Sequence, residues 1–182
     1  VLSTQVKQQD SKLGGQIGIS PNYRSRILLD LGGFLIKDEY TNSKEINSAD
    51  VLDVTRFRGF TAALRFARNT LNRKQYATSG HRYVLTIRGV TGVADYSPGS
   101  TSRVEANSRH HEWLQARATL ERYFALKGDR RAWGYFAEGM LSGQGLFRTY
   151  RSSLTTAPVF GPLPDSRTMF LDSYRGTNWA AA

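Results

Sequence analysis

The residues of this chain that could do chemistry begin with three neighbours, His110, His111 and Glu112. Imidazole and carboxylate groups are common ligands of divalent metals, so the triplet raises the question of a metal site. Adjacent residues of a strand point to opposite faces, however, and the two imidazoles would then not share one ion. We therefore predict no metal site and no bound cofactor.

Two further patterns that could support catalysis lead to the same expectation. The sequence has no Gly-x-Ser-x-Gly elbow of the kind that presents a lipase serine, and Gly143-Gln144-Gly145 is too short to hold a phosphate. Glu121 and Glu138 could approach one another across a hairpin, but a catalytic carboxylate pair also needs a defined cleft. We predict that this segment is not an enzyme.

Composition favours strands over helices. The 182 residues are 40% hydrophobic and 12% aromatic, with 17 glycines, which suits strands and tight turns. The formal net charge is +10, but the arginines recur singly along the chain, which argues against nucleic acid as a partner. Phosphate-bearing lipid headgroups are a more plausible anionic neighbour. The absence of cysteine excludes disulfides and thiolate metal sites and leaves the redox compartment open.

Period-two alternation gives the positions of the strands. In residues 24–40 the odd-numbered positions, which we call the apolar parity, include Ile27, Leu29 and Leu31. The even-numbered positions, the polar parity, begin with Arg24 and Arg26. The same alternation recurs in later segments, and we expect about eight strands. Short turns are expected at 20–23, 127–130 and 173–176, long loops at 41–50, 96–108 and 142–165, and a further strand at 167–171. The connection at 69–79 does not fit, because it is too long for a tight turn on the short-turn side.

The residue types at the polar positions of the strands distinguish a membrane barrel from a soluble sheet. It carries Gly, Ala, Thr and Gln with isolated Arg and Glu, a mixture typical of a barrel interior, and the segments exceed the length of ordinary globular strands. An interior polar network is predicted at Asp30, Arg65, Arg82, Arg88, Arg117, Glu121 and Glu138. Lipid contact is predicted for Leu29, Leu31, Leu85, Leu120 and Tyr135. Aromatic residues near strand ends, which would form interfacial girdles, are Tyr23, Tyr40, Tyr123, Phe124 and Trp133.

Several irregular stretches, in order, resemble the membrane-barrel region of the patatin-like phospholipase proteins of Bacteroidetes outer membranes, which is related to the BamA-type surface-antigen barrel. The resemblance covers about residues 55–182. The stretches are Asn69–Gly80, Tyr96–Ser100, Thr155–Pro164 and Ser166–Leu171, with Arg175 and Asn178.

This resemblance implies an all-β fold, an antiparallel transmembrane β-barrel of which residues 1–182 form one incomplete domain. About eight strands of a sixteen-stranded barrel would be present, and the patatin and linker domains, with the catalytic serine and aspartate, would lie upstream of this segment. The implied role is to anchor or translocate the attached lipid acyl hydrolase in the bacterial outer membrane. The implied partners are outer-membrane lipids, secretion or assembly subunits, or a second copy. The alternatives are a non-enzymatic barrel for protein assembly or secretion and a soluble β-domain that binds a ligand.

Overall fold

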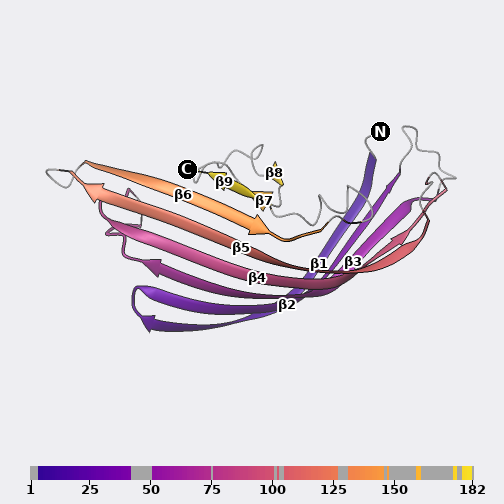
Figure 1. Ribbon diagram of the computed structural model, residues 1–182, viewed down its shortest axis with the longest axis horizontal. Coiled ribbons are helices and arrows are strands. Elements are labelled where there is room, and N and C mark those ends of the chain that lie inside the picture. Colours follow the sequence, from indigo (N-terminus) through magenta and orange to yellow (C-terminus); the bar gives the residue numbers. More distant parts are fainter. Residues whose placement is uncertain are drawn as a thin grey trace.

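The chain folds into one open antiparallel sheet (Figure 1). The computed structural model describes residues 4–41, 51–74, 76–100, 102, 105–126, 131–145, 147, 159–160, 174–175 and 178–181. Its long strands are β1 (Thr4–Asn22), β2 (Ser25–Thr41), β3 (Asp53–Asn69), β4 (Gly80–Ser97), β5 (Asn107–Ala125) and β6 (Ala132–Ser142). A short strand, β9 (Trp179–Ala181), pairs with β6, and β7 (Val159–Phe160) pairs with β8 (Tyr174–Arg175) in a separate ribbon. The predicted all-β, antiparallel fold is confirmed.

The long strands pair strictly in chain order, and each is antiparallel to the next. Between β2 and β6 the register runs without a shift, whereas β1 carries irregularities after Gln5 and after Ile19. Directly paired residues of neighbouring strands point to the same face, so the parity of one strand carries across the sheet. One such row is Leu29, Leu64, Ile87, Ala116 and Leu141. The adjacent row, on the opposite face, is Leu28, Arg65, Thr86, Arg117 and Met140.

The strands are long and the sheet is strongly curved (Figure 1). β2 and β3 have 17 residues each, β4 has 18, and β1 and β5 have 19. Globular strands are usually about 5 to 6 residues long, so each of these is about three times the ordinary length. The described residues include no helix, so none of them forms a helix long and apolar enough to cross a membrane.

The connections differ in part from the sequence expectations. The turn predicted at residues 20–23 begins later, because β1 continues to Asn22 and only Tyr23 and Arg24 turn the chain. The side chain of Asn22 accepts a hydrogen bond from the backbone N–H of Arg24 at 3.0 Å, which closes this tight turn. β1 also begins far earlier than its apolar alternation, because Thr4 to Leu13 is mostly polar and pairs along β2 all the same.

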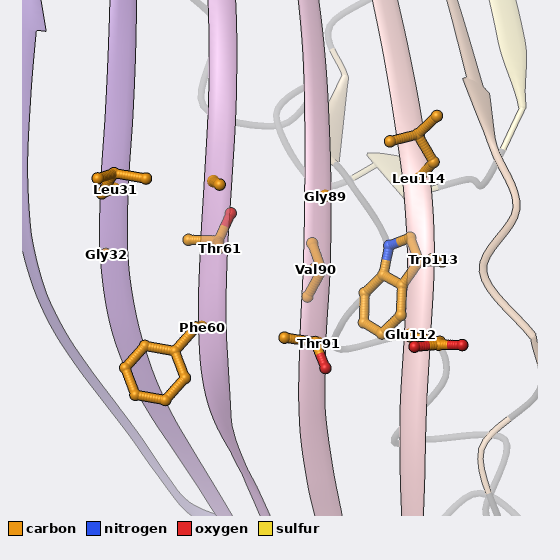
Figure 2. Close-up of a pocket in the computed structure, with 11 residues that line it drawn as sticks. Leu31, Gly32, Phe60, Thr61, Gly89, Val90, Thr91, Glu112, Trp113 and Leu114 are labelled. Atoms are coloured by element: carbon orange, nitrogen blue, oxygen red, sulfur yellow. The ribbon is translucent and has the colours of Figure 1, made fainter.

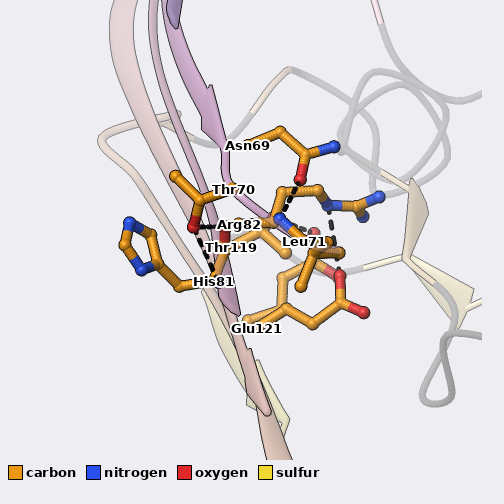
Figure 3. A network of polar contacts seen from close by, with 8 residues as sticks. Asn69, Thr70, Leu71, His81, Arg82, Thr119 and Glu121 are labelled. Carbon is orange, nitrogen blue, oxygen red and sulfur yellow. Dashed lines mark hydrogen bonds and ion pairs between the residues drawn. The ribbon is translucent and has the colours of Figure 1, made fainter. Parts of the chain in front are cut away.

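The connection between β3 and β4 is a loop rather than a tight turn, and Figure 3 shows its base. Its base is closed by Thr70, whose hydroxyl exchanges hydrogen bonds with the backbone of His81 at 3.0 Å. Further out, the Asn72 side-chain oxygen accepts from the backbone N–H groups of Thr78 and Ser79, at 3.0 and 3.2 Å. Backbone hydrogen bonds from Thr70 N–H to the His81 carbonyl at 2.8 Å and from Asn72 N–H to the Ser79 carbonyl at 3.1 Å continue the pairing beyond the strands, and the Asn72 side chain adds to it.

The expectations for the chain beyond β5 have different outcomes. The turn predicted at residues 173–176 is wrong where it can be compared, since Tyr174 and Arg175 form β8 and pair with β7. The strand predicted at residues 167–171 and the turn at 127–130 lie outside the described residues. The alternation of Trp133 to Leu141 is confirmed as β6, which pairs with β5 over 11 residues.

An aromatic cluster on one side of the sheet is the main packed core. Phe57 of β3 stacks on Trp113 of β5 with ring centroids 5.8 Å apart, and Phe34 of β2 lies 4.9 Å from Phe57. Phe147, which follows β6, reaches back over these strands and stacks on the His111 ring at 3.9 Å. Phe147 therefore covers this side of the sheet next to Phe57 and His111.

Candidate functional site: two chemically distinct sheet faces

The first face of the sheet, which we call the leucine face, carries the apolar parity of every long strand. It includes Leu29, Leu31, Leu64, Leu85 and Leu114. The described residues expose 19 large hydrophobic side chains, and all but Tyr23, Val51, Tyr76 and Leu126 lie on this face. Fifteen large apolar side chains thus share one surface, with exposed fractions from 38% at Tyr135 to 85% at Leu13.

Charged residues bound this apolar band at the end of the long loops. Arg58 pairs with Asp95 at 3.6 Å, and His110 lies 3.9 Å from Glu112. Further along β2, Lys37 donates to the Glu39 carboxylate, and this hydrogen bond holds the pKa of Glu39 below its usual value. These ion pairs all belong to the leucine face, so its polarity changes abruptly beyond Leu35, Phe60 and Val93.

Aromatic residues and arginines bound the band at the other end. Phe124 stacks on Trp133 with ring centroids 4.7 Å apart, and Tyr135 lies 6.4 Å from Phe124. The Arg122 guanidinium lies 4.7 Å from the centre of the Phe124 ring, where its charge meets the ring quadrupole. The basic residue on the apolar parity therefore lies at the margin of the band, as snorkelling requires.

The height of the band follows from strand geometry. On β4 it extends from Tyr83 to Val93, ten residue steps. At about 3.4 Å per residue this is about 34 Å along the strand, and a strand tilt of about 40° would reduce it to about 26 Å. That value is close to the roughly 25 Å apolar band of outer-membrane barrels.

The residues chosen from sequence as lipid-facing all lie on this face. Leu29, Leu31, Leu85 and Tyr135 are exposed, and Leu120 is half-buried. The aromatic selection is only partly correct. Phe124 and Trp133 lie on the leucine face, but Tyr40 is 2% exposed and Tyr123 lies on the opposite face against Gly134. The face that an aromatic side chain takes near a strand end is set by the cross-strand register and not by its distance from the end of the strand.

The opposite face, which we call the arginine face, holds all seven residues predicted for the polar network: Asp30, Arg65, Arg82, Arg88, Arg117, Glu121 and Glu138. Arg117 donates to Glu138 from both Nε and Nη2 at 2.6 Å, and the Thr119 hydroxyl donates to the same carboxylate at 3.1 Å.

Arg82 pairs with Glu121 at 3.2 Å (Figure 3). Asp30 accepts instead from the Gln16 side chain of β1. Among the described residues, Arg65 and Arg88 form no ion pair. Two of the pairings expected from the sequence are therefore present, Arg117 with Glu138 and Arg82 with Glu121.

The histidine pair behaves as its spacing predicts. His111 lies on the arginine face, packed against Phe57 and Phe147, and His110 lies on the leucine face, 3.3 Å from the Thr91 hydroxyl. The two imidazoles therefore cannot share one ion. The described part of the chain holds no group of three residues suited to a metal.

A polar cluster fixes the stretch Tyr96–Ser100 at the long-loop end of the sheet. The backbone N–H of Gly99 donates to the Asp53 carboxylate at 2.5 Å, and Asp53 has no exposed surface. The Tyr96 hydroxyl lies 2.6 Å from that of Ser102, and burial raises the pKa of this phenol. Sequence reasoning selected this stretch as an irregular motif but did not identify Asp53 as the group that holds it.

Comparison with protein-family models, with curated proteins and with solved structures gives no match to this chain.

Proposed function

We propose that this sheet is part of the wall of a bacterial outer-membrane β-barrel, with the leucine face toward lipid and the arginine face toward the interior. The observation that supports this proposal most directly is the exposed apolar band between a charged margin and an aromatic margin. Soluble monomers rarely expose a contiguous apolar patch larger than a few hundred Å², and fifteen large side chains on one face exceed this. Hydrocarbon is a solvent in which such a face is stable.

The arginine face supports the same proposal from the other side. Its charged groups are paired or partly exposed, and a hollow of about 730 Å³ lies over it, lined among others by Lys12, Asp30, Arg88 and Gln115. A barrel interior filled with water or with other segments would solvate these charges, whereas lipid would not. The two faces therefore need two different environments, and a membrane barrel provides both.

The role that we propose for this wall is to anchor or translocate an attached patatin-like lipid acyl hydrolase. This part of the proposal rests on the resemblance of the irregular loop stretches, and it assigns the chemistry to residues outside this chain. The segment itself would contribute membrane attachment, a lumen and an edge for further strands. Sequencing the complete gene product tests this part, and a parent chain without a Gly-x-Ser-x-Gly serine would contradict it.

The environment of the two faces can be tested with single cysteines, because residues 1–182 contain none. We would place a spin label on the full chain at Leu85 or Leu120, with Thr86 and Thr119 as neighbouring controls on the arginine face. In phospholipid vesicles, relaxation of the first pair by oxygen should exceed relaxation by a water-soluble nickel chelate. The control pair should show the reverse order. Equal nickel accessibility of both pairs, or folding in buffer without lipid or detergent, would contradict the membrane proposal.

A further inference from the structure

The two margins of the leucine face, and not its apolar centre, can distinguish one lipid from another. At the centre lies a depression between Leu31, Phe60 and Leu114 that is lined mainly by apolar groups (Figure 2). Such a surface accepts any acyl chain. Headgroups meet the protein at the margins, where the charges of the side chains decide which headgroup is favoured.

The aromatic margin, where β3 and β5 end and β4 begins, carries exposed arginines. His81 of β4 is paired directly with Arg122 of β5. Arg68 of β3 is paired with Tyr83, and the Tyr83 ring stacks on that of His81 with centroids 4.5 Å apart. Directly paired side chains have Cβ atoms about 5 Å apart, and diagonal neighbours have theirs about 7 to 8 Å apart. The two exposed arginines therefore flank the His81 imidazole from the two neighbouring strands.

No carboxylate of the described residues neutralises these arginines. The charged groups that act on the His81 imidazole are Arg68, Arg122 and Arg24, which lies in the turn between β1 and β2. Glu121 points to the arginine face, where it is engaged in the ion pair already described (Figure 3). The carboxylates that the described strands place on the leucine face all lie at the charged margin: Glu39, Asp95 and Glu112.

We propose that Arg68, His81 and Arg122 bind the phosphate of a phospholipid whose headgroup carries no ammonium, as in phosphatidylglycerol. This inference rests on the proposed function, because it requires the leucine face to contact lipid. The acyl chains extend from this margin over the paired residues Phe66 and Leu85 toward the middle of the apolar band.

The side chains at this margin have the donors that a phosphate needs. The Arg122 guanidinium lies over the Phe124 ring, 4.7 Å from its centre, and this stacking leaves the N–H groups at the edge of the guanidinium available. A guanidinium binds phosphate through two parallel N–H donors, and a ring nitrogen of His81 adds a further donor. Phosphate oxygens would thus accept from three neighbouring strands.

The lack of a carboxylate at this margin decides the class of headgroup. A zwitterionic headgroup carries an ammonium close to its phosphate, and this ammonium would meet positive side chains at the site. A headgroup without an ammonium has a net negative charge and avoids that repulsion. An arginine near a membrane surface favours anionic lipid by roughly fivefold, and we expect a factor of this size from each of Arg68 and Arg122.

The test uses the full chain in phosphatidylcholine vesicles that contain a trace of phosphatidylglycerol with a diazirine on an acyl chain next to the glycerol. A second sample contains phosphatidylcholine with the same diazirine. After illumination, mass spectrometry locates the labelled peptides. At the aromatic margin of β3, β4 and β5, label from phosphatidylglycerol should exceed label from phosphatidylcholine by roughly fivefold or more. Equal labelling of this margin by the two probes would overturn the proposal.

Arg68→Gln and Arg122→Gln should each reduce this excess by roughly fivefold. The matched control is Arg58→Gln, on the same strand and face as Arg68 but at the charged margin, where Asp95 is its partner. It removes the same charge and should leave the excess unchanged. An equal loss in Arg58→Gln and Arg68→Gln would indicate a general attraction between a basic chain and an anionic lipid, and would overturn the site.

An excess of soluble glycerol phosphate distinguishes a lipid from free phosphate. This compound has no acyl chains to place on the apolar band and should leave the label unchanged. Removal of the label would assign the arginines to a soluble phosphate and overturn the lipid. Absence of label from the entire leucine face with both probes would instead refute the membrane proposal, and the site with it.

Discussion

Replacing Ile87 with arginine separates the two environments that the leucine face could have. Ile87 lies near the middle of the apolar band on β4 and is 42% exposed. At the midplane of a bilayer an arginine on the lipid side of a barrel costs about 2 to 4 kcal/mol. In water the same change at an exposed position alters the free energy of unfolding by no more than about 0.5 kcal/mol.

The assay is reversible urea unfolding of the full chain from short-chain phosphatidylcholine vesicles, followed by the fluorescence of its 3 tryptophans. A cost of about 2 to 4 kcal/mol lowers the ratio of folded to unfolded chain by about 30-fold to several hundred-fold. The matched variant is Thr91→Arg, on the same strand and face but nearer to the Val93 end of the band and paired with Glu112. It should cost less than Ile87→Arg, because the penalty for an arginine on the lipid side falls from the midplane toward the interface.

The difference between these two variants carries the test, because both add the same side chain to the same strand. If Ile87→Arg and Thr91→Arg unfold at the same urea concentration as the parent chain, the band does not contact hydrocarbon. That result would refute the reasoning from exposure and parity, whatever the remainder of the fold.

Three further outcomes are expected. Arg117→Gln should lower the free energy of unfolding by about 1 to 3 kcal/mol by removing the ion pair with Glu138, and a double-mutant cycle with Glu138→Gln should show coupling, whereas additive effects would exclude the pair. Asn72→Ala should speed proteolytic cleavage between β3 and β4, because it removes the side chain that orders this loop; unchanged cleavage would show that the loop orders itself otherwise. Lys37→Met should raise the pKa of Glu39 toward 4.5, as measured by NMR titration; since this pKa is lowered in the folded chain, the ion pair stabilises it at neutral pH and is lost as the pH falls below about 4.5.

The sequence was sufficient to predict the long strands and the division of residues between the two faces. Alternation of the type seen at Leu29 and Asp30 has a period of two, and a sheet with no register shift preserves it from strand to strand. The polar start of β1 was missed because its strand character comes from pairing with β2 rather than from its own composition. Hydrophobic alternation reveals a strand only when one face of that strand is apolar. The start of β1 is polar on both faces and therefore shows no alternation.

The aromatic cluster could not be predicted from sequence, for a different reason. It combines residues that are far apart in the chain, such as Phe57 and Phe147. Their proximity depends on the cross-strand register and on where Phe147 lies, and neither is encoded in a short segment.

The unbroken register from β2 to β6 makes the chain sensitive to changes in length rather than in composition. A substitution within a strand alters one side chain, but deletion of a single residue there would move the side chain of every later residue in that strand to the opposite face of the sheet. Leucines would then point into the ion pairs, and arginines would point outward. The protein should therefore tolerate many replacements within its strands. Insertions and deletions should be tolerated between the strands, or within them in steps of two residues.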